Sequence, residues 1–196
     1  MEIFDLLITV SSMLSPPGLY RYSMPMRAIH WLTVLVVLTT YGLTYVVDLF
    51  ARGTPERATT WWLHISFGCV LILLVAARFV ARFTTYVPPT SAALSRPMSI
   101  ASHAVHGVLY LLLIAVPALG VLSAFTDGKA ITLFGLIDIA SPLTADKTLA
   151  HQMEDIHGLM ADSLLILAGL HAAAALWHHF VQKDDVLRRM LPGHGQ

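Results

Sequence analysis

Residues 156–182 read IHGLMADSLLILAGLHAAAALWHHFVQ, and this stretch decides the fold. A helix needs roughly 20 predominantly apolar residues to cross the hydrocarbon core of a bilayer. The stretch exceeds that length, and Asp162 is its one acid. His157 and His171 lie within it, 14 residues apart. We therefore predict a transmembrane helix that carries two histidines inside the membrane.

The spacing of these two histidines places them on one face of the helix. At about 100° per residue, 14 residues make nearly four full turns, so both side chains follow the same stripe. A rise of about 1.5 Å per residue separates them by roughly 21 Å along the axis. Ionisable residues are costly inside a membrane and mark a functional site by default. Two stacked levels are the arrangement that two haems need to carry electrons across a bilayer.

The composition of the whole chain agrees with a lipid environment. Of its 196 residues, 56% are hydrophobic and 12% are charged, whereas soluble domains carry about 25% charged residues. The mean hydropathy is +0.69. A net charge of zero gives no indication of nucleic-acid binding. The single cysteine, Cys69, excludes an intramolecular disulfide.

Three further apolar stretches are long enough to cross the membrane. We predict spans at about residues 28–48, 61–83, 102–125 and 156–181, all within one domain at residues 21–192. The predicted fold class is all-α, an integral membrane four-helix bundle. A buried soluble bundle is the alternative, and the length of each apolar stretch argues against it.

Residues 1–20 stand apart from this domain. They contain a short apolar run that begins with two acids and lacks the basic n-region of a signal peptide. Pro16 and Pro17 separate the run from the first span. We expect an N-terminal extension that either lies in the membrane interface or is not translated, with the start at Met24 or Met26.

The distribution of basic residues predicts the orientation. They gather before span one, between spans two and three and after span four: Arg21, Arg27, Arg78, Arg82, Arg96, Lys183, Arg188 and Arg189. An even number of spans puts these regions on one side, and the positive-inside rule makes both termini cytoplasmic. The acidic segment between spans three and four then faces outward. We expect its apolar patch, residues 131–139, either in the membrane interface or as a cap on the bundle.

Two further histidines match the depths of His157 and His171. His30 lies near the cytoplasmic start of span one, and His64 lies near the outer start of span two. Matching depth pairs His30 with His171 as axial ligands of an inner haem. It likewise pairs His64 with His157 as ligands of an outer haem. Two axial imidazoles leave no open position on iron, so such haems pass electrons.

Other functions of intramembrane histidines are less consistent with this pattern. A single histidine is often an interhelical hydrogen-bond partner, but four at two paired depths favour metal ligation. Zinc and non-haem iron sites recruit carboxylates or cysteines, which neither level supplies. Proton relays recruit acids at membrane depth, and Asp162 alone qualifies.

Several further residues gather at the predicted cytoplasmic side. A histidine N–H polarises a quinone carbonyl, and a guanidinium neutralises a haem propionate. The candidates for these two roles are His178, His179, His103, His106, Arg78 and Arg82. The alternative is that the histidines are interfacial residues at helix ends and that the arginines set topology.

Several short motifs are similar to those of a known family. They are MRAIHWL at residues 26–32, LHISFG at 63–68, VHGVLY at 105–110, GLHAAAALWHH at 169–179, Lys183-Asp184, and LRRMLP at 187–192. Together they resemble the bacterial cytochrome b561 family over about residues 22–192. The resemblance implies a four-helix protein of the bacterial inner membrane with two b-type haems that exchanges electrons with ubiquinone. It also implies the ligands His30, His64, His157 and His171.

The resemblance further implies oxidation of superoxide at the periplasmic face and reduction of ubiquinone near the inner haem and His178. Superoxide is an anion, so basic residues on the outer side would raise its encounter rate. The candidates are Arg52, Arg57, Lys129 and Lys147. Here the chain departs from the family, because Glu154 and Asp155 precede His157 where the family carries a basic residue nearby.

Two alternatives therefore remain beside superoxide:quinone oxidoreduction. One is a membrane electron carrier between quinone and a periplasmic redox protein, for which the acidic outer segment would be the docking surface. The other is a haem-free, histidine-lined transporter or metal-binding membrane protein.

Overall fold

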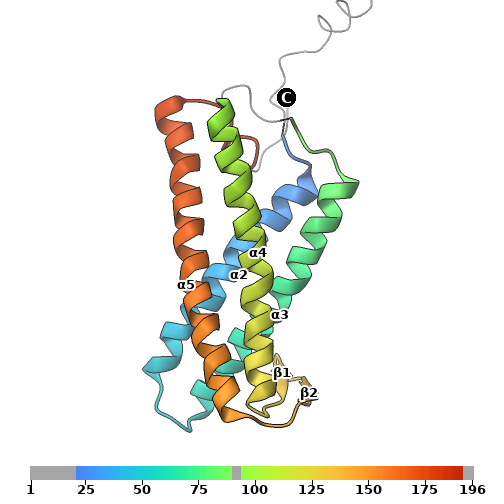
Figure 1. The fold of residues 1–196 in the computed structure, drawn as a ribbon, viewed down its shortest axis with the longest axis vertical. Coiled ribbons are helices and arrows are strands. Elements are labelled where there is room, and N and C mark those ends of the chain that lie inside the picture. Colours follow the sequence, from blue (N-terminus) through green and yellow to red (C-terminus); the bar gives the residue numbers. More distant parts are fainter. Residues whose placement is uncertain (1–20, 90–93, 192–196) are drawn as a thin grey trace, which may run out of the picture.

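Four long helices run along the length of the molecule (Figure 1). The computed structural model describes residues 21–89 and 94–191, so the prediction for residues 1–20 lies outside the described part. The helices are α2 (Met24–Val46), α3 (Pro55–Thr84), α4 (Arg96–Thr126) and α5 (Lys147–Trp177). Each is long and apolar enough to cross a membrane. The predicted four-helix membrane fold is therefore confirmed.

The helices begin earlier than the predicted spans because polar caps, not apolar content, set their starts. Proline occupies the first turn of α2, α3 and α4, where a missing N–H removes no helical hydrogen bond. At α3 the Thr54 hydroxyl accepts a hydrogen bond from Arg57 N, and at α5 the Asp146 carboxylate accepts one from Leu149 N. The apolar windows mark only the part of each helix at membrane depth.

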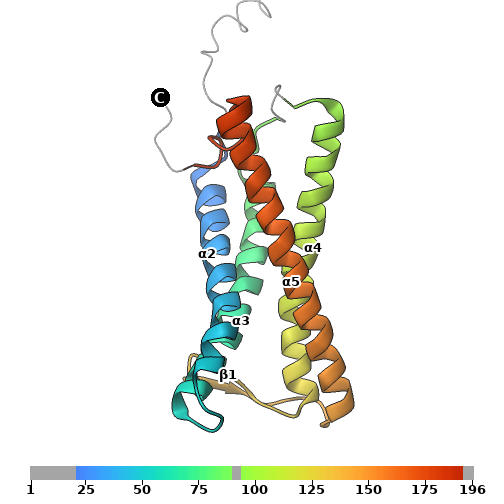
Figure 2. The same ribbon diagram turned by 90° about the vertical axis from the view of Figure 1, so that its left-hand side faces the viewer.

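The bundle consists of two helix pairs. α2 packs mainly against α3, and α4 packs mainly against α5 (Figure 2). Leu112, Val116 and Leu164 form an apolar cluster between α4 and α5. Most other large apolar side chains on the four helices point outward, as expected for a surface in contact with lipid. The four histidines predicted as haem ligands lie between the two pairs.

A short β-hairpin lies between α4 and α5, at one end of the bundle. Strands β1 (Ile131–Leu133) and β2 (Ile137–Ile139) pair antiparallel, with Thr132 opposite Asp138. We call this end of the bundle the hairpin end. The sequence analysis predicted an apolar patch here but no strands, because three residues are too few to reveal a period of two.

The opposite end, which we call the terminal end, is closed by the C-terminal segment. After α5 the chain makes one π-helical turn, η2 (His178–Gln182), and then turns back across the bundle. Trp31 Nε1 donates to Met190 O at 2.8 Å, and the buried Arg189 donates to Pro89 O at 2.6 Å. The C-terminal segment is thereby tied to α2 and to the chain that follows α3.

Candidate functional site

His64 and His157 face each other between α3 and α5, toward the hairpin end. Their ring centres lie 6.2 Å apart, and the two ring planes are inclined at 77°. Imidazole nitrogens bind metals such as zinc at roughly 2.0–2.1 Å, so two imidazoles on opposite sides of one metal have ring centres about 6 Å apart. The spacing fits a single metal centre between these two rings.

Each of these rings is oriented by a backbone carbonyl of a neighbouring helix. His64 Nδ1 donates to Thr40 O at 2.9 Å, and His157 Nδ1 donates to Val116 O at 2.8 Å. A carbonyl oxygen only accepts, so Nδ1 carries the hydrogen and Nε2 keeps its lone pair. This is the tautomer of a metal-ligating histidine, held by the outer hydrogen bond that such ligands usually make.

Gly120 on α4 makes room for the His157 ring. A Cβ at this position would lie 3.0 Å from His157 Cε1 and 3.3 Å from His157 Nδ1. Gly120 is not predictable from the sequence, because one glycine in an apolar span carries no signal of what it packs against.

The second level of histidines lies nearer the terminal end and involves all four helices. His30 from α2, Arg78 from α3, His106 from α4 and His171 from α5 meet there. His171 packs against His106 with ring centres 5.0 Å apart. His30 joins this group through its hydrogen bond with Arg78. The predicted partners therefore share one level, and His106 joins them.

Arg78 is the cation of this second level. Its Nη1 donates to His30 Nδ1 at 2.9 Å, and its Nε donates to the Tyr110 hydroxyl at 2.7 Å. The guanidinium also lies over the Tyr110 ring, 5.5 Å from its centre. A positive charge held inside a membrane span in this way suits an anionic group of a bound cofactor. Tyr110 was not among the predicted site residues.

The other predicted cytoplasmic-side residues are dispersed. His178, in the π-helical turn, lies 2.5 Å from Asp184 through Nδ1 and Oδ2, and both side chains are largely buried. His179 Nδ1 is buried and has no hydrogen-bond partner among the described residues. His103 and Arg82 are exposed. Single π-helical turns inside helices occur often at functional sites, which makes His178 the strongest of these four.

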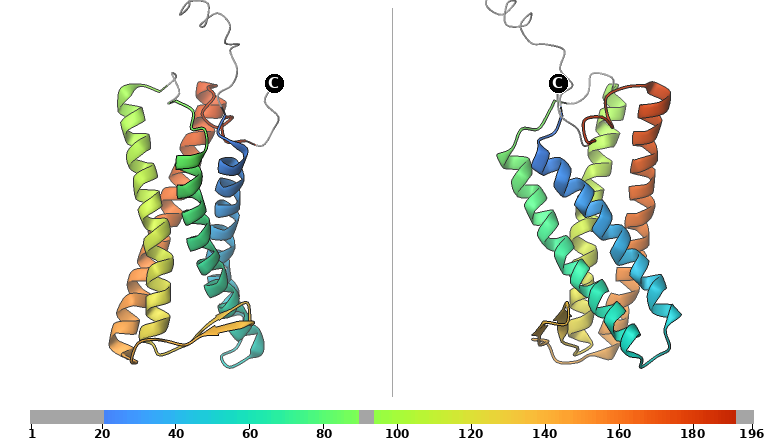
Figure 3. Two further views of the ribbon diagram at one scale, coloured as in Figure 1. Left: turned by 90° about the vertical axis from the view of Figure 1, so that its right-hand side faces the viewer. Right: turned by 180° about the vertical axis from the view of Figure 1, so that it is seen from behind.

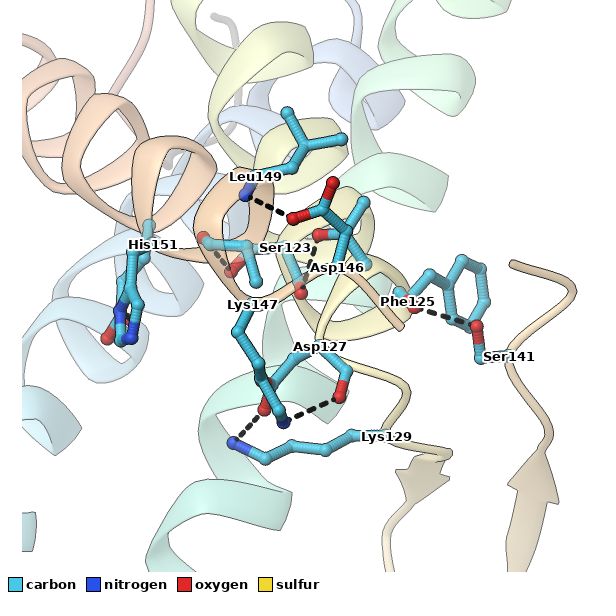
Figure 4. Close-up of polar contacts among 12 residues, drawn as sticks. Ser123, Phe125, Asp127, Lys129, Ser141, Asp146, Lys147, Leu149 and His151 are labelled. Atoms are coloured by element: carbon cyan, nitrogen blue, oxygen red, sulfur yellow. Dashed lines mark hydrogen bonds and ion pairs between the residues drawn. The ribbon is translucent and has the colours of Figure 1, made fainter. Parts of the chain in front are cut away.

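At the hairpin end, two of the predicted basic residues share one acid. Lys129 and Lys147 lie 2.6 Å and 2.5 Å from the carboxylate oxygens of Asp127 (Figure 4). Hydrogen bonds from the two ammonium groups lower the pKa of Asp127 to about 2. The carboxylate therefore stays ionised and offsets part of their positive charge.

The two predicted arginines of this end differ from each other. Arg57 forms an ion pair with Asp48 at 3.3 Å and donates to Val47 O at 2.6 Å. Arg52 lies exposed in the connection between α2 and α3. Three of the four candidate cations thus lie beside a carboxylate, so the positive field at this end is weaker than their number indicates.

Asp162 lies on α5 between the two histidine levels. The Tyr41 hydroxyl on α2 donates to Asp162 Oδ1 at 2.7 Å, and Tyr45 donates to the Tyr41 oxygen at 3.4 Å. This contact links the two helix pairs at membrane depth. The sequence indicates the acid but not its tyrosine partner, because the pattern of residues does not specify how α2 and α5 cross.

Larger metal-binding clusters are not found in the described part of the chain. Residues 21–89 and 94–191 contain no group of three or more histidines, cysteines or carboxylates that could hold a metal ion. Zinc sites in proteins usually require three or four such ligands. The arrangement therefore suits metal centres bound by two imidazoles better than a zinc site.

Comparison with known proteins identifies relatives over nearly the whole chain. The family described as prokaryotic cytochrome b561 matches residues 21–193. The chain is 33% identical to the "Probable superoxide oxidase CybB" of Yersinia pestis, over 88% of this chain and 96% of the relative. It is 34% identical to cytochrome b561 homolog 2 of Escherichia coli strain K12, over 87% of this chain and 91% of the relative. Cytochrome b562 of Cereibacter sphaeroides is 28% identical, over 91% and 98%.

Proposed function

The chain belongs to the prokaryotic cytochrome b561 family, and on that premise we propose that it transfers electrons from superoxide to ubiquinone across the bacterial inner membrane. The family establishes a haem-binding membrane protein of electron transfer. The relative from Yersinia pestis, whose name is "Probable superoxide oxidase CybB", supports superoxide as the donor. The 6.2 Å spacing of His64 and His157, with both Nδ1 atoms bonded to carbonyls, is the observation that carries the proposal.

We propose two haem b groups, each held by a histidine pair. His64 and His157 would bind the haem nearer the hairpin end, and His30 and His171 would bind the other. When bound, each haem supplies a one-electron carrier without an open iron position. The roughly 21 Å of helix between His157 and His171 would keep the two centres at separate depths.

Arg78 would have a different role at the second level. Binding through Nε2 requires that His30 Nδ1 carry a hydrogen, and Nδ1 then no longer accepts one from Arg78. The guanidinium would become available for a haem propionate while its Nε keeps the hydrogen bond to Tyr110.

Ubiquinone would bind at the terminal end of the bundle. His106 and His178 are the stronger candidates for contact with its carbonyls, because His106 packs against His171 and His178 is held by the buried Asp184. His103, His179 and Arg82 would contribute less to quinone binding at this end. None of these histidines has a proposed role as an iron ligand.

In the proposed orientation the terminal end is cytoplasmic and the hairpin end is periplasmic. Arg27 and Arg189 both bind the chain at the terminal end, where most of the remaining basic residues also lie. The positive-inside rule supports this placement. Superoxide would then approach the His64–His157 level, attracted by Arg52 and by the Lys129–Asp127–Lys147 group.

Rapid mixing with superoxide tests the proposed donor. Absorbance must first show a reducible b-type haem spectrum, since its absence from folded protein would exclude a cytochrome. Haem reduction that is near the diffusional limit and slows steeply with salt would support superoxide as the donor. Slow reduction without salt dependence would contradict it.

A second function is favoured by the acids beside the hairpin end. Glu154 and Asp155 are exposed just before His157 on α5. A surface of this charge suits a basic periplasmic redox protein that would exchange electrons with the outer haem. Rapid reduction by such a protein, together with slow reduction by superoxide, would favour this carrier function.

A further inference from the structure

The β-hairpin at the hairpin end has one apolar face and one polar face. Side chains alternate between the two faces along each strand, and directly paired residues share a face. The register puts Ile131, Leu133, Ile137 and Ile139 on one face. Thr132 and Asp138 lie on the other, where the Thr132 hydroxyl donates to Asp138 Oδ1 at 2.6 Å.

The bundle covers only half of the apolar face. Ile131 on β1 is 2% exposed, since β1 packs against α3 and α4. On β2, Ile137 is 59% and Ile139 43% exposed, and Leu136 in the turn is 85% exposed. The hairpin projects sideways from the end of the bundle (Figure 3), so β2 extends the apolar face beyond the helices.

The polar backbone of the hairpin turn is satisfied by the protein itself. Ser66, a fully buried residue of α3, accepts a hydrogen bond from Phe134 N at 2.7 Å and donates to Thr132 O at 3.4 Å. Leu136 N donates to Leu133 O at 2.9 Å. Because these backbone groups already have partners in the protein, the desolvation cost of placing the turn in the membrane interface is lower.

Two tryptophans of α3 indicate that the hairpin lies at the depth of the membrane interface. Gly135 in the turn faces the ring of Trp62 on α3, and Trp61 precedes it; both tryptophans are partly exposed. Tryptophan is enriched at the boundary between lipid headgroups and acyl chains. The turn is therefore held beside residues typical of the membrane interface. Phe134 also contacts Phe67 edge to face, with ring centres 5.7 Å apart.

From these four observations we propose that the hairpin is a membrane-interface anchor. The apolar face, with Ile137 and Ile139, and the exposed turn residue Leu136 lie in the headgroup–acyl boundary of the leaflet at the hairpin end. Its polar face, with Asp138, points to water. The partner is phospholipid, because the hairpin turn lies against Trp62 of α3, a partly exposed residue of a membrane-spanning helix, and leaves its apolar side chains exposed beside it. The inference is independent of the haems and of the orientation of the chain.

Spin labels at single cysteines test this arrangement. In a Cys69→Ser background, cysteines replace Leu136, Ile137, Asp138 or Ile139, one at a time. Leu73→Cys in the middle of α3 serves as the lipid reference, and Arg52→Cys serves as the water reference. Each labelled full-length protein is placed in vesicles of phosphatidylethanolamine and phosphatidylglycerol. Collision rates with oxygen and with a water-soluble nickel chelate are then measured.

We expect the collision rates to alternate between lipid-like and water-like values along β2. Labels at residues 136, 137 and 139 should collide with oxygen more than with nickel, as at residue 73, whereas the label at 138 should resemble that at 52. Nickel accessibility at all four positions would overturn the proposal. Protection from both reagents with spin–spin broadening would also overturn it, since a second copy would then cover the face. Asp138→Cys removes the hydrogen bond from Thr132 and could disturb the hairpin. The difference in collision rates between the labels at residues 136 and 52 therefore tests the proposal separately from the variant at 138.

Discussion

The Cα of Gly120 on α4 lies against the imidazole of His157 on α5, so closely that a Cβ would stand 3.0 Å from His157 Cε1. We expect Gly120→Val to remove the haem nearer the hairpin end, because overpacking costs about 1–3 kcal/mol and the ring cannot keep its position. Gly120→Ala should weaken that haem to a lesser extent. Haem content per protein, measured from the reduced pyridine complex, checks both variants.

Gly169→Ala on α5 is the matched control for this variant. No atom lies within 4 Å of a Cβ at Gly169, so the added methyl meets open space. Both haems should remain, and helix propensity favours alanine by about 0.8–1.0 kcal/mol in water. If Gly120→Val kept both haems, the contact between residue 120 and His157 would have no part in haem binding.

Variants of the second level test the proposed ligand pair. His171→Ala should lose the haem nearer the terminal end and keep the other, so that haem content falls from two to one per chain. His106→Ala should keep both, although its ring lies 5.0 Å from His171. Loss of a haem in His106→Ala with retention in His30→Ala would make His106 the ligand. Equal loss of both haems in folded His171→Ala would contradict two separate levels.

The sequence predicts the levels of the histidines better than their contacts. Hydropathy locates four spans, and the spacing of His157 and His171 defines two depths, because both depend on helix geometry alone. The contact of His106 with His171 depends on the rotation and tilt of α4, which periodicity in a weakly amphipathic span does not specify. The hydrogen bond between Tyr41 and Asp162 depends likewise on how two helices cross.

Side-chain contacts in the loops of the hairpin end are likewise not specified by the sequence pattern. The sequence offers Lys129 and Lys147 as candidates for attracting an anion, yet in the structure Asp127 forms ion pairs with both. These three residues are brought together by the path of a connection that contains two short strands. No local pattern in the sequence specifies that path, so the charge balance becomes visible only in the fold.

The Tyr41–Asp162 hydrogen bond should contribute to stability in the membrane. Tyr41→Phe leaves the Asp162 carboxylate without its 2.7 Å donor and should cost about 0.6 kcal/mol, the average for interhelical hydrogen bonds in membranes, and at most about 1.7 kcal/mol. Thermal unfolding, followed by loss of the haem absorbance, checks the value. Tyr45→Phe is the control, since its hydroxyl contacts Tyr41 at 3.4 Å and should matter little.

A double-mutant cycle separates this hydrogen bond from packing. If the bond is the cause, Tyr41→Phe should cost less in an Asp162→Leu background, which offers no acceptor, than in the native chain. An equal cost in both backgrounds would assign the effect to lost packing of the tyrosine ring.

Ionisation of Asp127 should make the free energy of unfolding depend on pH in the acidic range. Its pKa is lowered from 3.8 to about 2 by Lys129 and Lys147, so the folded state favours the ionised carboxylate. The stabilisation is complete above about pH 4 and is lost as the pH falls toward 2. Because both lysines are largely exposed, we expect less than about 1 kcal/mol. Asp127→Asn should remove this part of the acid dependence of unfolding, and an unchanged dependence would contradict the role of the carboxylate.

Release of the same two lysines should change the reaction with superoxide. Asp127→Asn removes one negative charge and frees two ammonium groups at the hairpin end, so an anionic donor should arrive faster and with a steeper salt dependence. Asp138→Asn is the matched control, because it removes one negative charge at the same end but releases no lysine. In rapid mixing with superoxide, we expect the rate of haem reduction to increase in the order native chain, Asp138→Asn, Asp127→Asn. If all three rates coincide at low salt, the basic residues of the hairpin end do not guide superoxide, and the carrier function with a periplasmic redox protein becomes the better explanation.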